Sequence, residues 1–400
     1  MRAALSVLLV VTTAAAGGGL KLIRRGEREE RARDAAGTAL AEIRRVRDED
    51  IHFFERRVTR DPTGAFDLVQ LGGLFMRRYR ESGDEGDLQA AEAAARRSLA
   101  NRDRRNTAAR LLLTGALLGQ HRFTEARVAA KQSAAEAPEN AVVQATLGET
   151  LLELGEYREA DRVFRRLMPR RFEPAVAPRY ARWLELRGAA GAARRLLEAA
   201  RDDAARASGP ASIEQLAWYE LRLGEMALRF GAPHEAGRRL RAGLALVPDD
   251  WRLLAAAARL SLSTGRLDRA IELGDSSLGR HLDPATLAAV GDAWQRKGNA
   301  ARAEEYFRAM EAMSQAPAGG FHRAWYFALL DHDRRIPEVL AAVRRDIETR
   351  RDVYGYDVLA WAFFKSGRLE EARAASARAL AWGTEDPELR ARARAVTEAR

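Results

Sequence analysis

The pattern of large apolar and small residues repeats along the chain. Residues 147–160 read LGETLLELGEYREA, residues 223–236 read LGEMALRFGAPHEA, residues 290–303 read VGDAWQRKGNAARA and residues 359–372 read LAWAFFKSGRLEEA. In each stretch a large residue is followed by a small one, then by a Gly eight residues after the large residue and an Ala five after that Gly. This pattern predicts a repeated pair of helices joined by a short turn.

The physical role of each position follows from its residue type. The Gly is expected to end the first helix in the left-handed conformation, which glycine adopts at no steric cost. The Ala is expected where the second helix approaches the first, with a large residue four positions later filling the seam. The equivalent glycines are Gly155, Gly188, Gly231, Gly265, Gly298 and Gly367, followed by Ala160, Ala193, Ala236, Ala270, Ala303 and Ala372, with Phe164, Leu197, Leu240 and Phe307 in the seam.

The interval between these glycines is close to 34 residues, except for an insertion after Leu197 and one degenerate unit before Gly367. A helix–turn–helix repeat of this length resembles the tetratricopeptide repeat (TPR), over about residues 66–387. The family's Trp at the start of the pattern is mostly missing, and the units at 175–216 and 318–352 are weak. The chain is similar to bacterial multi-TPR proteins with an N-terminal signal or anchor segment.

The resemblance implies an all-α fold, a right-handed α-solenoid of about nine TPR-like helix–turn–helix units. Each unit is expected to pack only against its neighbours and to bury one continuous seam. Residues 24–65 are expected to form an N-terminal helical segment, and residues 388–400 a C-terminal capping helix.

The first 23 residues have the composition of a targeting segment. Arg2 precedes an apolar stretch, and Ala14 and Ala16 stand in the A-x-A relation of a cleavage site. Residues 1–23 are therefore predicted to be a signal peptide or an N-terminal membrane anchor, since the whole apolar stretch approaches spanning length. Either alternative predicts a protein that is exported, periplasmic or otherwise extracytoplasmic, or anchored to the inner membrane.

The net charge of +10 is weaker evidence for an anionic partner than its size suggests. Of the 67 basic residues all but four are arginines, and they are interspersed with Asp and Glu. Interleaved charges form solvated helix faces with i,i+4 pairs rather than one basic stripe. Binding of nucleic acid or another anionic polymer through the Arg-rich surface therefore remains the alternative hypothesis.

No arrangement of residues indicates catalysis. The chain has no cysteine, which excludes disulfides and thiolate chemistry. The cluster Asp331-His332-Asp333 falls where other units have their Gly turn, so we interpret it as a polar turn rather than a metal site. We expect no enzyme activity, no metal and no cofactor.

The first helices of such a solenoid line its concave face. The sequence therefore predicts a protein–protein interaction scaffold of the bacterial cell envelope that holds a peptide or a partner helix in a concave TPR groove. The predicted partner-binding residues are Glu149, Arg182, Glu185, Glu225, Arg259, Asp292, Gln295, Asp357 and Trp361.

Overall fold

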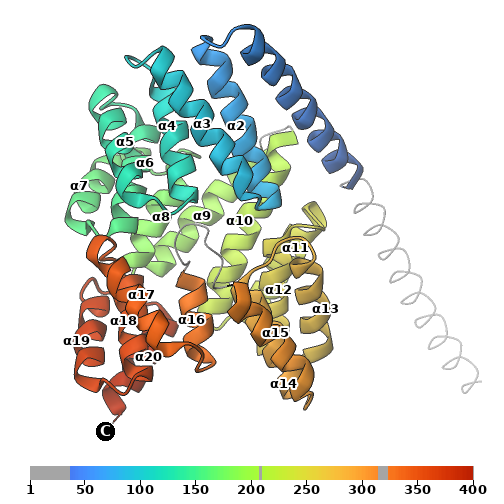
Figure 1. The fold of residues 1–400 in the computed structure, drawn as a ribbon, viewed down its shortest axis with the longest axis vertical. Helices are drawn as coiled ribbons and strands as arrows, with labels where there is room; N and C mark the ends of the chain where they lie inside the picture. Colours follow the sequence, from blue (N-terminus) through green and yellow to red (C-terminus); the bar gives the residue numbers. More distant parts are fainter. Residues whose placement is uncertain (1–36, 207–209, 314–322, 400) are drawn as a thin grey trace, which may run out of the picture.

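The computed structural model describes residues 37–206, 210–313 and 323–399 (Figure 1). These ranges contain helices and turns but no strand. The predicted signal or anchor segment, residues 1–23, lies outside the described residues. Within the described ranges no helix is both long enough and apolar enough to cross a bilayer.

A helix over residues 37–60 precedes a regular series of antiparallel helix pairs. The nine pairs in the described ranges are α2 (Ala65–Ser82) with α3 (Glu85–Asn101), α4 (Thr107–Gly119) with α5 (Phe123–Glu136), α6 (Ala141–Leu154) with α7 (Tyr157–Leu167), α8 (Ala177–Leu186) with α9 (Ala190–Arg206), α10 (Pro210–Arg229) with α11 (Pro233–Leu246), α12 (Trp251–Ser263) with α13 (Leu267–Leu278), α14 (Pro284–Arg296) with α15 (Ala300–Met313), α16 (Arg323–Asp331) with α17 (Ile336–Thr349), and α18 (Val353–Lys365) with α19 (Leu369–Leu380). A short 3₁₀ helix, η1 (Met168–Arg170), follows α7, and α20 (Pro387–Glu398) ends the array. The predicted all-α solenoid of about nine helix–turn–helix units is confirmed.

The six predicted turn glycines all have left-handed backbone, with φ between 72° and 81°. Gly155 shows the local cause: its amide closes the end of α6 on the carbonyls of Leu151 and Leu152. In the weak unit between α16 and α17, Asp333 and Arg335 adopt positive φ instead, 54° and 50°. The chain direction therefore reverses in the same way at this turn without a glycine.

The predicted small-to-large contact between paired helices is also observed. A Cβ on Gly148 in α6 would lie 2.7 Å from Phe164 in α7, and one on Gly224 in α10 would lie 2.9 Å from Leu240 in α11. Phe307 in α15 lies against Gly291 in α14 in the same way. The small residue therefore sets how closely the two helices of a unit approach.

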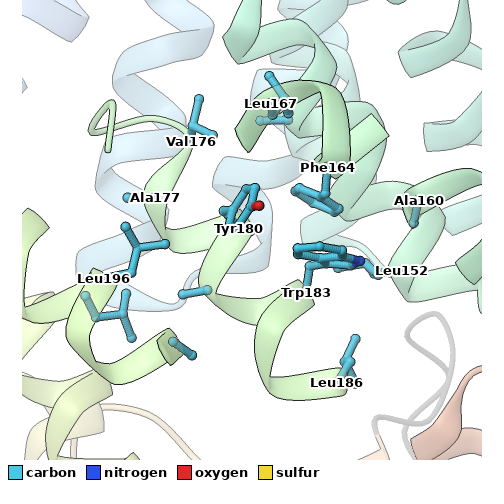
Figure 2. Close-up of a cluster of buried hydrophobic side chains, with 14 of the residues drawn as sticks. Leu152, Ala160, Phe164, Leu167, Val176, Ala177, Tyr180, Trp183, Leu186 and Leu196 are labelled. Atoms are coloured by element: carbon cyan, nitrogen blue, oxygen red, sulfur yellow. The ribbon is translucent and has the colours of Figure 1, made fainter. Parts of the chain in front are cut away.

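The core continues from one unit to the next, as Figure 2 shows for the helices around α8. Phe164 of α7 stacks on Trp183 of α8 with ring centroids 5.7 Å apart, and Trp183 also meets Tyr180 edge-on at 5.0 Å. The same cluster extends to Leu196 and Leu197 of α9. Large aromatic side chains thus fill the joint between units despite the weak repeat signal at 175–216.

The expectation that a unit packs only against its neighbours is wrong. The turn between α17 and α18 contacts the turn between α6 and α7, far earlier in the chain. The amide of Arg351 donates to the Leu154 carbonyl at 3.1 Å, and the amide of Val353 donates to the Tyr157 hydroxyl at 2.7 Å. Tyr157 also packs edge-on against Trp382, with centroids 4.9 Å apart. Each unit adds a small rotation, and the accumulated rotation brings units one superhelical turn apart into contact.

A second set of long-range contacts joins the N-terminal helices to the middle of the chain. Leu40 is buried in a cluster with Ala217 and Leu221 of α10. Arg44 forms a two-bond ion pair with Asp249, the shorter bond being 2.8 Å, and Arg77 of α2 forms one with Glu214 of α10 at 3.0 Å. Figure 1 shows α2 beside α10, and α17–α20 below α7–α9. The superhelix therefore encloses its own interior.

Candidate partner-binding interior

In the part of the chain that the structure describes, two half-open cavities lie inside the superhelix. The first has a volume of about 910 Å³ and lies between the helix 37–60, α2, α6, α8, α10 and the start of α12. The second has a volume of about 940 Å³ and lies between α6, α8, α10, α12, α14, α16 and α20. Both are lined by Leu152, Glu153, Arg182 and Arg229, so they meet at one boundary.

The first cavity combines an apolar floor with charged walls. Leu40, Leu152, Leu197 and Val247 are buried in its floor, and the half-buried Trp218 adds aromatic surface. Eight arginines line it against six carboxylates, which leaves an excess of positive charge. Volumes of this size are typical of sites that enclose a small ligand or a short stretch of chain.

The second cavity has the opposite charge balance, with six arginines against seven carboxylates in its lining. Its apolar contribution comes from residues such as Ala288, Leu228 and Phe327, the last covered by the guanidinium of Arg392 at 4.2 Å from the ring centroid. The interior therefore changes from net positive to net negative along its length.

A network of charged and polar groups marks the boundary between the cavities. Arg182 donates to the hydroxyl of Tyr354 at 3.3 Å, and that hydroxyl donates to Asp386 at 3.2 Å. Arg229 lies 3.5 Å from Asp386 and 3.6 Å from Glu185. Burial alone would lower the pKa of Arg182, but Tyr354, Glu185 and Glu153 raise it above its usual range. Burial would also lower the pKa of Arg229, but Tyr354, Asp386 and Glu185 raise it, so both arginines remain charged inside the protein.

The contact between superhelical turns forms part of the wall. Arg350 pairs with Glu153 of α6, and Arg323 forms a two-bond pair with Asp352, one bond being 2.7 Å. Burial would raise the pKa of Glu153, but the charges of Arg350, Arg182 and Arg323 lower it overall. Because these pairs are desolvated and mutually satisfied, breaking one would leave an uncompensated buried charge.

Six of the nine predicted partner-binding residues line the cavities. The first cavity is lined by Glu149, Arg182 and Glu185. The second is lined by Glu225, Arg259 and Asp292, and Arg182 lines both. Each of the six has a partner within the protein: Glu149 pairs with Arg179, Glu185 with Arg222, Glu225 with Arg222 and Arg259, and Asp292 with His332.

The other three predicted residues line neither cavity. Gln295 is exposed. Asp357 is buried and paired with Arg392 of α20 at 2.6 Å, and Trp361 donates its indole N–H to Asp331 at 2.7 Å. The counting of concave positions assumed an open array, whereas α20 covers α18 at the C-terminal end.

Sequence reasoning missed several residues of the interior, among them Arg77, Arg80, Arg252, Arg323 and Arg350. Arg350 and Arg252 lie at or beside turns, and Arg80 lies in the extended last part of α2. The only available signal was the length of α2, 18 residues against 13 in α4, which carries its end beyond the normal repeat.

The Asp331-His332-Asp333 turn directs its three side chains to three different partners. Asp331 accepts from Trp361, His332 Nε2 lies 3.1 Å from Asp292, and Asp333 accepts from Lys365 at 2.8 Å. Across residues 37–206, 210–313 and 323–399, no group of three or more His, Asp or Glu side chains converges as a metal site would require. The geometry of this turn is that of a polar helix connection.

Comparison with known proteins supports the repeat assignment. The family model described as "Tetratricopeptide repeat" matches residues 117–182, which span the end of α4 to the middle of α8. No curated protein matches the sequence.

Several solved structures match the chain at low identity. The chain is 13% identical to a chain of the APC/C hetero-tetramer Cut9-Hcn1, covering 83% of this chain and 63% of that one, with a TM-score of 0.48. It is 13% identical to human IFIT1, solved as a dimer with m7Gppp-AAAA, covering 86% of this chain and 88% of that one, with a TM-score of 0.47. It is 20% identical to a thermophilic TPR protein from Thermus thermophilus, covering 45% and 98%, with a TM-score of 0.35. The chain thus spans less than two thirds of the first of these proteins.

The matched repeats and the nine successive helix pairs define the class: an all-α superhelix of the kind that serves as a protein-interaction scaffold. Residues 117–182 match the tetratricopeptide repeat, and the helix pairs before and after them have the same helix–turn–helix arrangement. Repeats of this family are generally scaffolds rather than catalytic domains.

Proposed function

We propose that the protein is a non-catalytic scaffold of the bacterial cell envelope that holds a segment of a partner protein inside its superhelix. The observation that carries the proposal is the pair of adjoining cavities, lined by the first helices of successive units. The apparent targeting segment at residues 1–23 supports an envelope location.

The size of the interior favours an extended segment over a partner helix. A helix with its side chains is about 10–12 Å across, so a cavity of about 910 Å³ would take only a turn or two of it. An extended chain is narrower and can pass from the first cavity to the second along their shared boundary.

The proposal is tested by photo-crosslinking in cells from three aromatic positions. A photoreactive phenylalanine analogue replaces Trp218 in the first cavity, Phe327 in the second, or Phe66, whose side chain is 69% exposed and lines neither cavity. We expect the two interior positions to trap the same partner protein and Phe66 not to trap it. Capture from Phe66 with none from Trp218 and Phe327 would show that the partner binds outside the cavities.

The location is tested separately by cell fractionation. The full-length chain is expected in the membrane or periplasmic fraction, and a chain lacking residues 1–23 in the cytoplasm. Equal distribution of the two proteins would contradict an envelope location without bearing on partner binding.

A further inference from the structure

Arg80 differs from the other arginines around it in the first cavity. Arg77 forms a two-bond pair with Glu214, Arg252 pairs with Asp250 at 2.7 Å, and Arg179 pairs with Glu149 at 2.6 Å. Arg80 makes no hydrogen bond or ion pair with any residue that the structure describes. Its side chain lies at the end of α2, exposed to the cavity that it lines.

The surroundings of Arg80 favour a negatively charged group. Desolvation and the positive charges of Arg77 and Arg252 lower its pKa, against the opposing effects of Glu214 and Glu81. A carboxylate placed between these side chains would relieve the repulsion. Such a group would also accept charge-assisted hydrogen bonds, which are the stronger kind.

We propose that Arg80, with Arg77 and Arg252 beside it, forms a subsite that receives an Asp or Glu side chain from an acidic segment of the partner protein. The inference rests on the proposed function and adds the chemistry of the bound segment. Because the cavity floor is apolar, the segment carries apolar residues next to its acidic ones.

The lining of the first cavity argues against a continuous polyanion such as a nucleic acid strand. Glu81, Glu149, Glu153, Glu185, Glu214 and Asp250 lie among the arginines. Because every nucleotide of a strand carries a charged phosphate, successive phosphates would meet these carboxylates as well as Arg80. A peptide can place a single carboxylate at the subsite and neutral residues elsewhere.

The experiment selects a random heptapeptide library displayed on phage against the full-length protein, Arg80→Gln and Arg97→Gln. Arg97 is the matched control, because it is exposed on α3, also has no hydrogen-bond or ion-pair partner among the described residues, and lines neither cavity. We expect the wild type and Arg97→Gln to enrich peptides that combine Asp or Glu with Leu-like residues. Arg80→Gln is expected to lose the acidic preference.

One enriched peptide is then synthesised with a fluorescent label, together with a version in which its acidic residues are replaced by Gln or Asn. Fluorescence anisotropy is expected to show about tenfold weaker binding of the acidic peptide to Arg80→Gln. The neutral peptide is expected to bind both proteins equally weakly. Circular dichroism and thermal unfolding establish that Arg80→Gln is folded.

The outcomes separate the claim of an acidic subsite from the claim of a scaffold function. Peptides enriched without an acidic preference, or bound equally by Arg80→Gln, overturn the subsite but leave the scaffold function standing. Failure to enrich any sequence contradicts both. Binding of oligo-dT or polyphosphate that is weakened by Arg80→Gln, in the absence of peptide binding, would replace the acidic peptide by a phosphate polymer.

Discussion

Gly155 is glycine for two independent reasons. Its φ of 76° lies in the left-handed region, and a Cβ there would collide with the backbone of Arg351 on the next superhelical turn. Gly265 has only the first of these reasons: its φ is 74°, but a Cβ there would meet nothing within 4 Å.

Comparing Gly155→Ala with Gly265→Ala therefore separates backbone strain from the contact between turns. Gly265→Ala is expected to lower the free energy of unfolding by about 1 kcal/mol, the cost of a left-handed alanine. Gly155→Ala is expected to lower it by about 3 kcal/mol, because the added methyl also separates the turns. Urea denaturation measures both. Equal losses would show that the contact at Arg351 contributes nothing to stability.

The fold favours the charged form of His332. Its Nδ1 lies 2.7 Å from the Ala328 carbonyl and its Nε2 3.1 Å from the Asp292 carboxylate, so both nitrogens face acceptors. Burial alone would lower its pKa, but these two hydrogen bonds and the charges of Asp292 and Asp331 raise it above the usual 6.5.

A raised pKa in the folded state fixes the sign of the pH dependence. The stabilisation by His332 is fully present below about pH 6.5 and is lost as the pH rises through the higher folded pKa. His332→Gln is expected to flatten this decline in the free energy of unfolding, measured by urea denaturation from about pH 5.5 to about pH 8.5. The exposed His234→Gln serves as control. An unchanged slope in His332→Gln would contradict the assignment.

Within a helix pair, the approach of the second helix depends on one small residue. Gly148 of α6 faces Phe164 of α7, whose side chain is fully buried. Alanine at position 148 would favour the helix by about 1 kcal/mol, yet its methyl would press on a ring that has no room to move.

A double-mutant cycle tests this contact between α6 and α7. Gly148→Ala is expected to cost about 1–2 kcal/mol of unfolding free energy in the wild type. In the Phe164→Leu background the same change should be neutral or stabilising, because the shorter side chain leaves space. Additive effects would mean that the two positions do not meet.

These element-scale contacts were predictable because they are local. Gly148 and Phe164 are sixteen residues apart in one unit, and the same pairing recurs between Gly224 and Leu240. The turn glycines were predictable for the same reason. In the weak unit at 318–352 the sequence shows no glycine at the turn, and Asp333 and Arg335 adopt left-handed backbone in its place.

At the scale of the whole molecule, the closing of the superhelix could not be predicted from the repeat. In the sequence, Tyr157 occupies the ordinary first position of a second helix. Nothing in the repeat pattern indicates that its hydroxyl accepts a hydrogen bond from Val353. The contact arises from small rotations summed over successive units, and residue spacing does not specify their total. Concave positions such as Glu149 and Arg259 could be counted from the repeat, whereas the covering of Asp357 by α20 could not.

The hydroxyl of Tyr157 is expected to contribute to this closure. Tyr157→Phe would leave the buried Val353 amide without its acceptor, at a cost of about 2 kcal/mol. Tyr180→Phe is the control, since the structure shows no hydrogen bond from that hydroxyl to the described residues. Thermal unfolding of the two variants measures the difference. A Tyr157→Phe protein as stable as Tyr180→Phe would argue against the observed hydrogen bond.

Amide hydrogen exchange at Arg351 and Val353 tests the enclosed interior most directly. These amides precede or begin α18, where a helix has no internal acceptor for its N–H groups; only the turn after α6 supplies one. With single-residue resolution by NMR, we predict that both exchange far more slowly than the amide of Trp251, the equivalent first residue of α12. Exchange of Arg351 and Val353 as fast as that of Trp251 would show an open array, and would contradict a partner site enclosed between superhelical turns.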